Sequence, residues 1–201
     1  MSAPARAMRR LTARLLAALE LPDGDEGLLP AVGRAVEQVR GRPVRLHAVP
    51  FPPDIASGLW IQRPSHDVIA YEAHTDLEHQ LVIVGHEVWH MFEGHCRSLT
   101  AHGPAASRAA DGGAADAVRD VVAAVCAADV AGAPPERPLE VSLHVALRAD
   151  ASTVHQEEEA EFFGVRFATA VDAARTEARS GVDLRNLAGR IRFSLAHRIR
   201  S

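Results

Sequence analysis

One five-residue segment of the chain has the residue types and the spacing of a metal site. It reads His86-Glu87-Val88-Trp89-His90, an HExxH motif. On a helix, residues i and i+4 lie on one face, so the imidazoles of His86 and His90 can bind the same tetrahedral zinc ion. The carboxylate of Glu87 beside them can then act as general base toward a water on the metal. The motif predicts a zinc site with its own catalytic base.

The third protein ligand has to come from outside the motif, which leaves the fourth position for water. Metzincins use a glycine three residues after the second histidine, followed by a third histidine. Here Glu93 and Cys96 occupy those places, with Gly94 and His95 each displaced by one, which disfavours a metzincin site. Glu93 shares a face with both motif histidines, but a helix also spreads these residues along its axis. We therefore interpret Glu93 as solvated.

A cluster of glutamates later in the chain is the favoured source of the third ligand, as in gluzincin-type sites. It comprises Glu157, Glu158, Glu159 and Glu161. At about 100° per residue, the apolar positions that follow, Phe162, Phe163, Phe167 and Ala170, define one stripe of a helix. Only Glu159 lies on the axis of that stripe, and a carboxylate there is costly to bury unless a cation neutralises it. We predict Glu159 as the ligand and the other three as solvated.

Two further side chains are candidates for assisting catalysis. His155 lies one turn before Glu159 and is the candidate electrophile. Tyr71, the only tyrosine of the chain, is a candidate for stabilising an oxyanion beside the zinc. The alternatives left open are packing for Tyr71, the commoner role of an aromatic in a strand, and no role for His155.

The elements that must position these residues follow from apolar periodicity and from turn residues. We expect helices over about residues 7–20 and 28–40, strands over 44–49, 58–62 and 67–72, the HExxH helix over 76–94, and later helices over 114–131, 153–179 and 184–199. Thr153 and Gln156 have the spacing of a capping box that would begin the long helix.

Two segments have no settled prediction. Residues 139–147 fit a strand or a helix equally well, and residues 101–114 form a small-residue segment that we expect to be mobile. The pattern as a whole predicts one α+β domain over residues 1–201. Its small three-stranded antiparallel sheet would pack on the HExxH helix, with helices before and after it.

Composition bounds the classes of function. With 47% hydrophobic residues, the 201-residue chain can bury one sizeable core. A net charge of −4 gives no electrostatic reason to expect binding to nucleic acid or to an anionic membrane. The two cysteines, Cys96 and Cys126, are too few for a disulfide framework and suit a reducing compartment. Arg14 and Glu20 interrupt the apolar run near the N-terminus, so we expect an amphipathic first helix and a cytoplasmic protein.

Several of these motifs together resemble the ImmA/IrrE-type metallopeptidases, in particular the actinobacterial branch described as toxin or regulator components. The resemblance covers about residues 43–170. Besides HExxH, it rests on Gly58-Leu59-Trp60, Tyr71-Glu72, His79-Gln80 and Glu159-Ala160-Glu161. It implies a zincin-like fold, with Glu159 as the glutamate ligand of a Glu-Ala motif. The interval from His90 to Glu159 is longer than is usual in the family.

The resemblance implies a zinc-dependent peptidase that cleaves a regulatory protein partner such as a helix-turn-helix repressor. Zn²⁺ would polarise the scissile carbonyl, and Glu87 would transfer a proton from water to the leaving amine. The alternative is a non-proteolytic metal-binding toxin or regulator component that acts by protein–protein interaction. Glu87 favours the enzyme, because a structural zinc site needs no general base and would be expected to have a fourth protein ligand.

Overall fold

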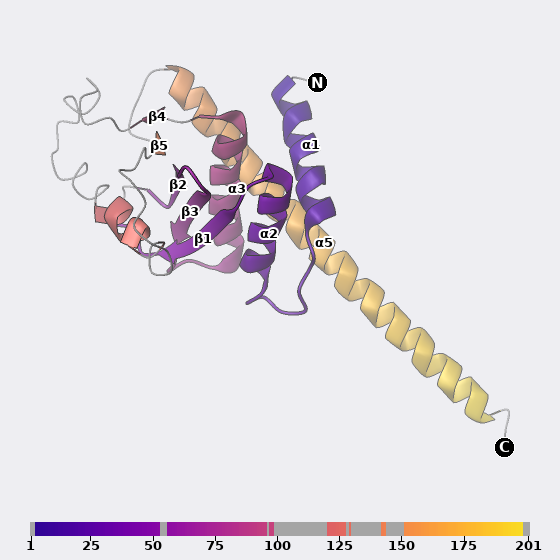
Figure 1. The fold of residues 1–201 in the computed structure, drawn as a ribbon. Coiled ribbons are helices and arrows are strands. Elements are labelled where there is room, and N and C mark those ends of the chain that lie inside the picture. Colours follow the sequence, from indigo (N-terminus) through magenta and orange to yellow (C-terminus); the bar gives the residue numbers. More distant parts are fainter. Residues whose placement is uncertain are drawn as a thin grey trace.

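The computed structural model describes residues 3–52, 56–95, 97–98, 120–127, 129, 142–143 and 151–198; in the last helix, side chains are described for residues 154–180 (Figure 1). The elements in chain order are α1 (Ala3–Ala18), α2 (Leu28–Arg40), β1 (Val44–Val49), β2 (Gly58–Gln62), β3 (Asp67–Glu72), α3 (Leu77–Glu93), β4 (Arg97–Ser98), β5 (Ser142–Leu143) and α5 (Ala151–Arg198). Residues 120–127 form one more helical segment. The chain therefore has an α+β fold.

The sheet has the strand order β1-β3-β2-β5-β4, with three strands of five or six residues followed by two of two residues. Strands β2 and β3 form the expected antiparallel hairpin. Strand β1, however, lies parallel to β3, so the prediction of a wholly antiparallel sheet is wrong. The reason is that the residue pattern of a single strand indicates which of its residues are buried and carries no information about its direction relative to a neighbouring strand.

The two faces of the sheet are covered by different helices. One face, which includes Trp60, Ile69 and Tyr71, belongs to the larger core with α1, α2, α3 and α5. The opposite face, here called the outer face, packs against the helical segment 120–127 through Val121 and Val125. Figure 1 shows these helices on the two sides of the sheet. The HExxH helix is therefore held between the sheet and α5, as the contacts α3 makes with β2, β3 and α5 show.

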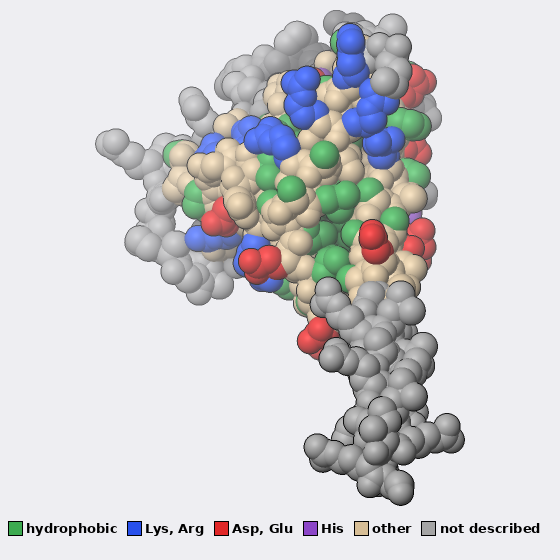
Figure 2. All heavy atoms as spheres, turned by 90° about the vertical axis from the view of Figure 1, so that its right-hand side faces the viewer, with side chains coloured by type: hydrophobic (Ala, Val, Ile, Leu, Met, Phe, Trp, Pro, Cys, Tyr) green, Lys and Arg blue, Asp and Glu red, His purple; other side chains and the backbone are tan. Residues whose placement is uncertain are grey.

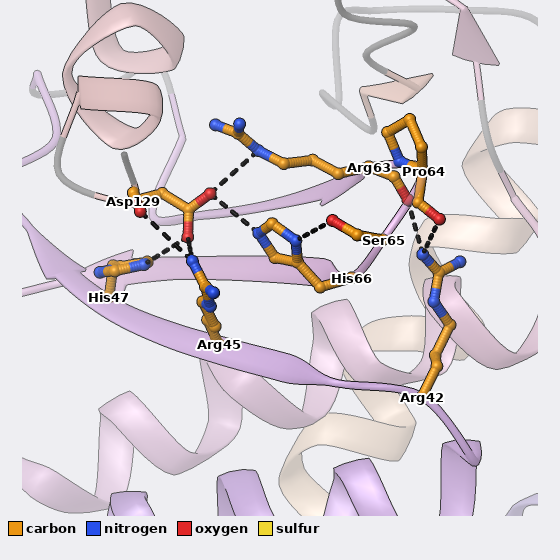
Figure 3. Close-up of polar contacts among 8 residues, drawn as sticks. All are labelled: Arg42, Arg45, His47, Arg63, Pro64, Ser65, His66 and Asp129. Carbon is orange, nitrogen blue, oxygen red and sulfur yellow. Dashed lines mark hydrogen bonds and ion pairs between the residues drawn. The ribbon is translucent and has the colours of Figure 1, made fainter. Parts of the chain in front are cut away.

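A charged cluster joins Asp129, two residues after the helical segment 120–127, to the outer face (Figure 3). The buried carboxylate of Asp129 lies 2.9 Å from Arg45 Nη1, 3.0 Å from Arg63 Nε and 2.9 Å from His66 Nε2. His47 Nε2 lies 3.5 Å away. Burial acts to raise the pKa of Asp129, but the bonds from His66 and Arg45 and the nearby charges of His66 and Arg63 outweigh it and lower this pKa. The Asp129 cluster thus holds this residue against β1 and the β2–β3 turn.

Helix α5 is continuous from Ala151 to Arg198, so the prediction of two separate helices is wrong. Its start at Ala151 also places Thr153 inside the helix, and the predicted capping box does not begin it. Gly181 lies between the two predicted helices, but one glycine in a helix costs only about 1 kcal/mol relative to alanine, too little to end a long helix. Figure 1 shows the second half of α5 extending beyond the rest of the domain.

The predicted bounds agree with the structure for α2, β1, β2 and β3, and α1 lies a few residues earlier than expected. Of the undecided segment 139–147, the structure describes the two residues of β5, which are extended and pair with β2. The segment 101–114 lies outside the described residues. Among the helices that are described, none is both long enough and apolar enough to cross a membrane.

The surface is uneven in charge. On the face turned to the viewer in Figure 2, most basic side chains lie toward the top of the view, and hydrophobic side chains lie across its middle. All basic residues of the chain other than histidine are arginines.

Candidate metal centre

Helix α3 presents the HExxH motif, and local sequence defines both of its ends. Asp76 is the N-cap, and its side chain accepts a hydrogen bond of 2.8 Å from the backbone N–H of His79. Gly94 ends the helix in the left-handed conformation at φ 71°, and its N–H donates to the carbonyl of His90. Glycine suits this position because it has no Cβ to clash. The expected helix over 76–94 is therefore confirmed with its two caps.

Helices α3 and α5 cross with their backbones in close contact. A Cβ on Gly85 would lie 2.9 Å from the Cα of Gly164, and a Cβ on Gly164 would lie 2.5 Å from the carbonyl oxygen of Val82. Only glycine leaves room for this approach. The crossing brings Glu157, two turns before Gly164, alongside the motif histidines.

The side chains of His86, His90 and Glu157 form a compact group, here called the His86–His90–Glu157 cluster. Their potential ligand atoms all lie within 4.8 Å of one another. The two Nε2 atoms are 3.0 Å apart, and Glu157 Oε2 lies 3.4 Å from His86 Nε2 and 3.8 Å from His90 Nε2. His90 is fully buried, whereas the His86 and Glu157 side chains remain about one quarter exposed, at 24% and 23%. Among the described residues, the cluster is thus accessible from the side of His86 and Glu157.

The donor atoms fit a zinc ion in number, type and separation. Bonds of about 2.0–2.1 Å at tetrahedral angles place neighbouring ligand atoms roughly 3.3 Å apart. The observed separations of 3.0, 3.4 and 3.8 Å lie around this value. Two imidazoles and one carboxylate are also a donor set typical of catalytic zinc sites.

The structure places Glu157 beside the histidines, where the sequence had indicated Glu159. The buried face of α5 is formed by Ala160, Phe163, Gly164, Phe167, Ala168 and Val171. Phe162, which had helped to define the apolar stripe, is 61% exposed. Without Phe162 the stripe rotates toward the line of Glu157, three residues before Ala160 and seven before Gly164. The carboxylate of Glu159 instead lies 3.3 Å from His155 Nε2.

Glu87 of α3 is buried beside the cluster, and its side chain lies against Gly58, the first residue of strand β2. A Cβ on Gly58 would lie 2.7 Å from Glu87 Oε1 and 2.6 Å from a methyl carbon of Ile83. The absence of a side chain at Gly58 therefore leaves the space that the Glu87 carboxylate uses. The sequence had given Gly58 only as part of a strand motif, and its close approach to α3 is set by the tertiary packing.

The electrostatics of the cluster favour a cation. Burial acts to lower the pKa of His86, but the bond to Glu157 and the negative charges of Glu87, Glu157 and Glu161 outweigh it and raise this pKa. A site that stabilises a proton on His86 also attracts a metal cation, so protons and metal compete for this nitrogen.

The two predicted assisting residues lie outside the cluster. The His155 side chain is 72% exposed and contacts Glu158 and Glu159 on its own helix. Tyr71 is buried in the larger core, on β3 opposite Gly58. Burial raises the pKa of Tyr71 above its ordinary value. The roles suggested for His155 and Tyr71 stay predictions.

Comparison of the chain with protein-family models, with curated proteins and with solved structures gave no match.

Proposed function

We propose that this chain is a zinc-dependent metallopeptidase with His86, His90 and Glu157 as metal ligands and Glu87 as general base. The observation that carries the proposal is the His86–His90–Glu157 cluster, whose ligand atoms lie within 4.8 Å of one another. Two motif histidines and a carboxylate from a separate helix converge there, with the motif glutamate buried beside them. Three protein ligands are the number used by catalytic zinc sites, which keep one position for water or substrate.

Each residue has a distinct part in the proposed reaction. When bound, the metal supplies Lewis acidity, which polarises a peptide carbonyl and acidifies water. The Glu87 carboxylate accepts the proton of the attacking water and delivers it to the leaving amine. The partial exposure of His86 and Glu157 gives the peptide a side from which to approach, while the buried His90 anchors the site on α3.

The substrate class in this proposal is a protein or peptide. The resemblance of the sequence to ImmA/IrrE-type peptidases suggests a regulatory partner such as a helix-turn-helix repressor. This part of the proposal is supported by the resemblance, and the partly exposed side of the cluster is compatible with the approach of a flexible segment of such a partner.

The test combines metal content with hydrolysis. Purified protein is analysed for bound zinc and incubated with a candidate helix-turn-helix regulator, and cleavage is followed by mass spectrometry with and without a chelator. The matched variant is Glu87→Gln, which keeps the shape of the side chain and removes the base. We expect wild type to bind one zinc and cleave, and Glu87→Gln to bind zinc without cleaving.

Two results would count against the proposal. Cleavage at full rate in the presence of the chelator would exclude metal catalysis. Stoichiometric zinc in both proteins with no cleavage of peptide libraries by either would favour the non-proteolytic alternative, a metal-binding toxin or regulator component that acts by protein–protein interaction.

A further inference from the structure

His95 lies beside the imidazole of His90 on the side opposite to Glu157 and His86. His95 Nδ1 is 3.2 Å from His90 Nδ1, whereas the Nε2 atom of His90 faces His86 Nε2 at 3.0 Å. The two rings meet edge to face, with centroids 5.4 Å apart. The two nitrogens of the buried His90 ring therefore have different neighbours.

The backbone after α3 holds His95 in this place. Gly94 adopts φ 71°, and the backbone N–H of His95 donates a 3.1 Å hydrogen bond to the carbonyl of His90. This left-handed turn reverses the chain, so that a residue five positions after His90 returns to the same side of the helix. The sequence showed His95 only as a histidine out of place for a metzincin ligand.

We propose that His95 is a positioning residue that accepts a hydrogen bond from Nδ1–H of His90 and thereby fixes His90 with its Nε2 lone pair directed at the metal position. A neutral imidazole has one N–H and one lone pair, and the partner of one nitrogen decides which nitrogen is free to bind a metal. For His90 to bind through Nε2, its proton must lie on Nδ1. The Nδ1 atom of His95 is placed to accept that proton.

The same geometry argues against His95 as a ligand. Its Nδ1 contacts Nδ1 of His90, and the five-membered ring places Nδ1 and Nε2 on different edges. The three atoms that converge on the metal position are Nε2 of His86, Nε2 of His90 and Oε2 of Glu157. The effect of His95 on zinc rests on the proposed metal site, but its hydrogen bond to His90 does not.

The test uses the full chain and two measurements. Zinc affinity is measured by competition with a chelator, and the tautomer of His90 is read in metal-free protein from long-range ¹H–¹⁵N NMR correlations of the imidazole. The variants are His95→Ala, His95→Gln and His90→Ala, with His74→Ala as control because the His74 side chain is 79% exposed and pairs with Glu72. Circular dichroism checks that each variant is folded.

We expect wild-type His90 to carry its proton on Nδ1. His95→Ala should shift His90 toward the Nε2–H tautomer and weaken zinc binding by about 10–100-fold, the usual effect of removing a residue that orients a ligand. His95→Gln, whose amide oxygen can accept the same proton, should recover part of the affinity, and His74→Ala should leave it unchanged.

Each contrary result has its own meaning. An Nε2–H tautomer of His90 in wild type, or unchanged tautomer and affinity in His95→Ala, would overturn the positioning role. A loss of zinc in both His95→Ala and His95→Gln as complete as in His90→Ala would make His95 a ligand. If wild type binds no zinc, the proposed function fails, and the tautomer alone then decides whether His95 orients His90.

Discussion

The Gly85–Gly164 crossing offers the sharpest test of how the fold positions the candidate metal centre. In Gly164→Ala, the new Cβ would lie 2.5 Å from the carbonyl oxygen of Val82. Ordinary contact needs roughly 3.4 Å, so α3 and α5 must separate by about 0.9 Å at this point. The oxygen belongs to the helix backbone and cannot rotate away as the end of a flexible side chain could.

The expected cost follows from two opposing terms. Overpacking costs about 1–3 kcal/mol, while alanine gains about 1 kcal/mol over glycine in a helix. Since the clash at Gly164 is severe, we take the upper end of the overpacking cost. After the gain from alanine is subtracted, the net loss of stability is about 2 kcal/mol. Gly85→Ala, with its nearest contact at 2.9 Å, should lose less. In a chain of this length, 2 kcal/mol corresponds to a fall in Tm of about 4–8 °C.

The assay is thermal unfolding of Gly164→Ala, Gly85→Ala and the control Gly24→Ala, whose added Cβ would meet nothing within 4 Å. We expect the fall in Tm to decrease in that order, with almost none for Gly24→Ala. Zinc affinity should fall in the same order for the two crossing variants, because separation of the helices moves Glu157 away from His86. If Gly164→Ala is as stable as wild type and binds zinc equally well, the inference that this crossing positions the site is refuted.

Three further predictions concern the charged groups. Glu157→Ala should remove zinc binding while Glu159→Ala leaves it largely intact, as measured by metal analysis; the opposite result would restore the ligand predicted from sequence. Because the pKa of His86 is raised above its ordinary value of 6.5, protons should weaken zinc binding already as the pH falls toward that value, and chelator competition from pH 8 to 6 measures this. Asp129→Ala should cost about 3 kcal/mol at pH 7, because it leaves the buried guanidinium of Arg63 without its counter-charge. Since the pKa of Asp129 is lowered, the stabilisation is present above the ordinary carboxyl pKa and is lost as the pH falls through the lowered value, so wild type and variant should converge in acid-range denaturant unfolding.

Local signals determined much of the framework. The strands Val44–Val49, Gly58–Gln62 and Asp67–Glu72 have the predicted bounds, because a short run of strand-forming residues and the turn residues that flank it are properties of a short segment. The same holds for α3, where Asp76 and Gly94 act on the backbone within one turn. The 3.0 Å approach of His86 Nε2 and His90 Nε2 likewise follows from i,i+4 spacing on one helix.

Tertiary structure decided what depends on contact between segments. The direction of β1 relative to β3 is one case, because either direction buries the same residues. The choice between Glu157 and Glu159 is the other. Residues two positions apart on a helix, such as Glu157 and Glu159, point about 200° apart around the helix axis. The rotation of α5 about its axis therefore selects the carboxylate that faces α3. That rotation is set where Gly164 contacts Gly85 and Val82 of α3, which are far from the glutamates in the sequence. The sequence of α5 alone is misleading, because the apolar Phe162 is exposed and does not belong to the buried face.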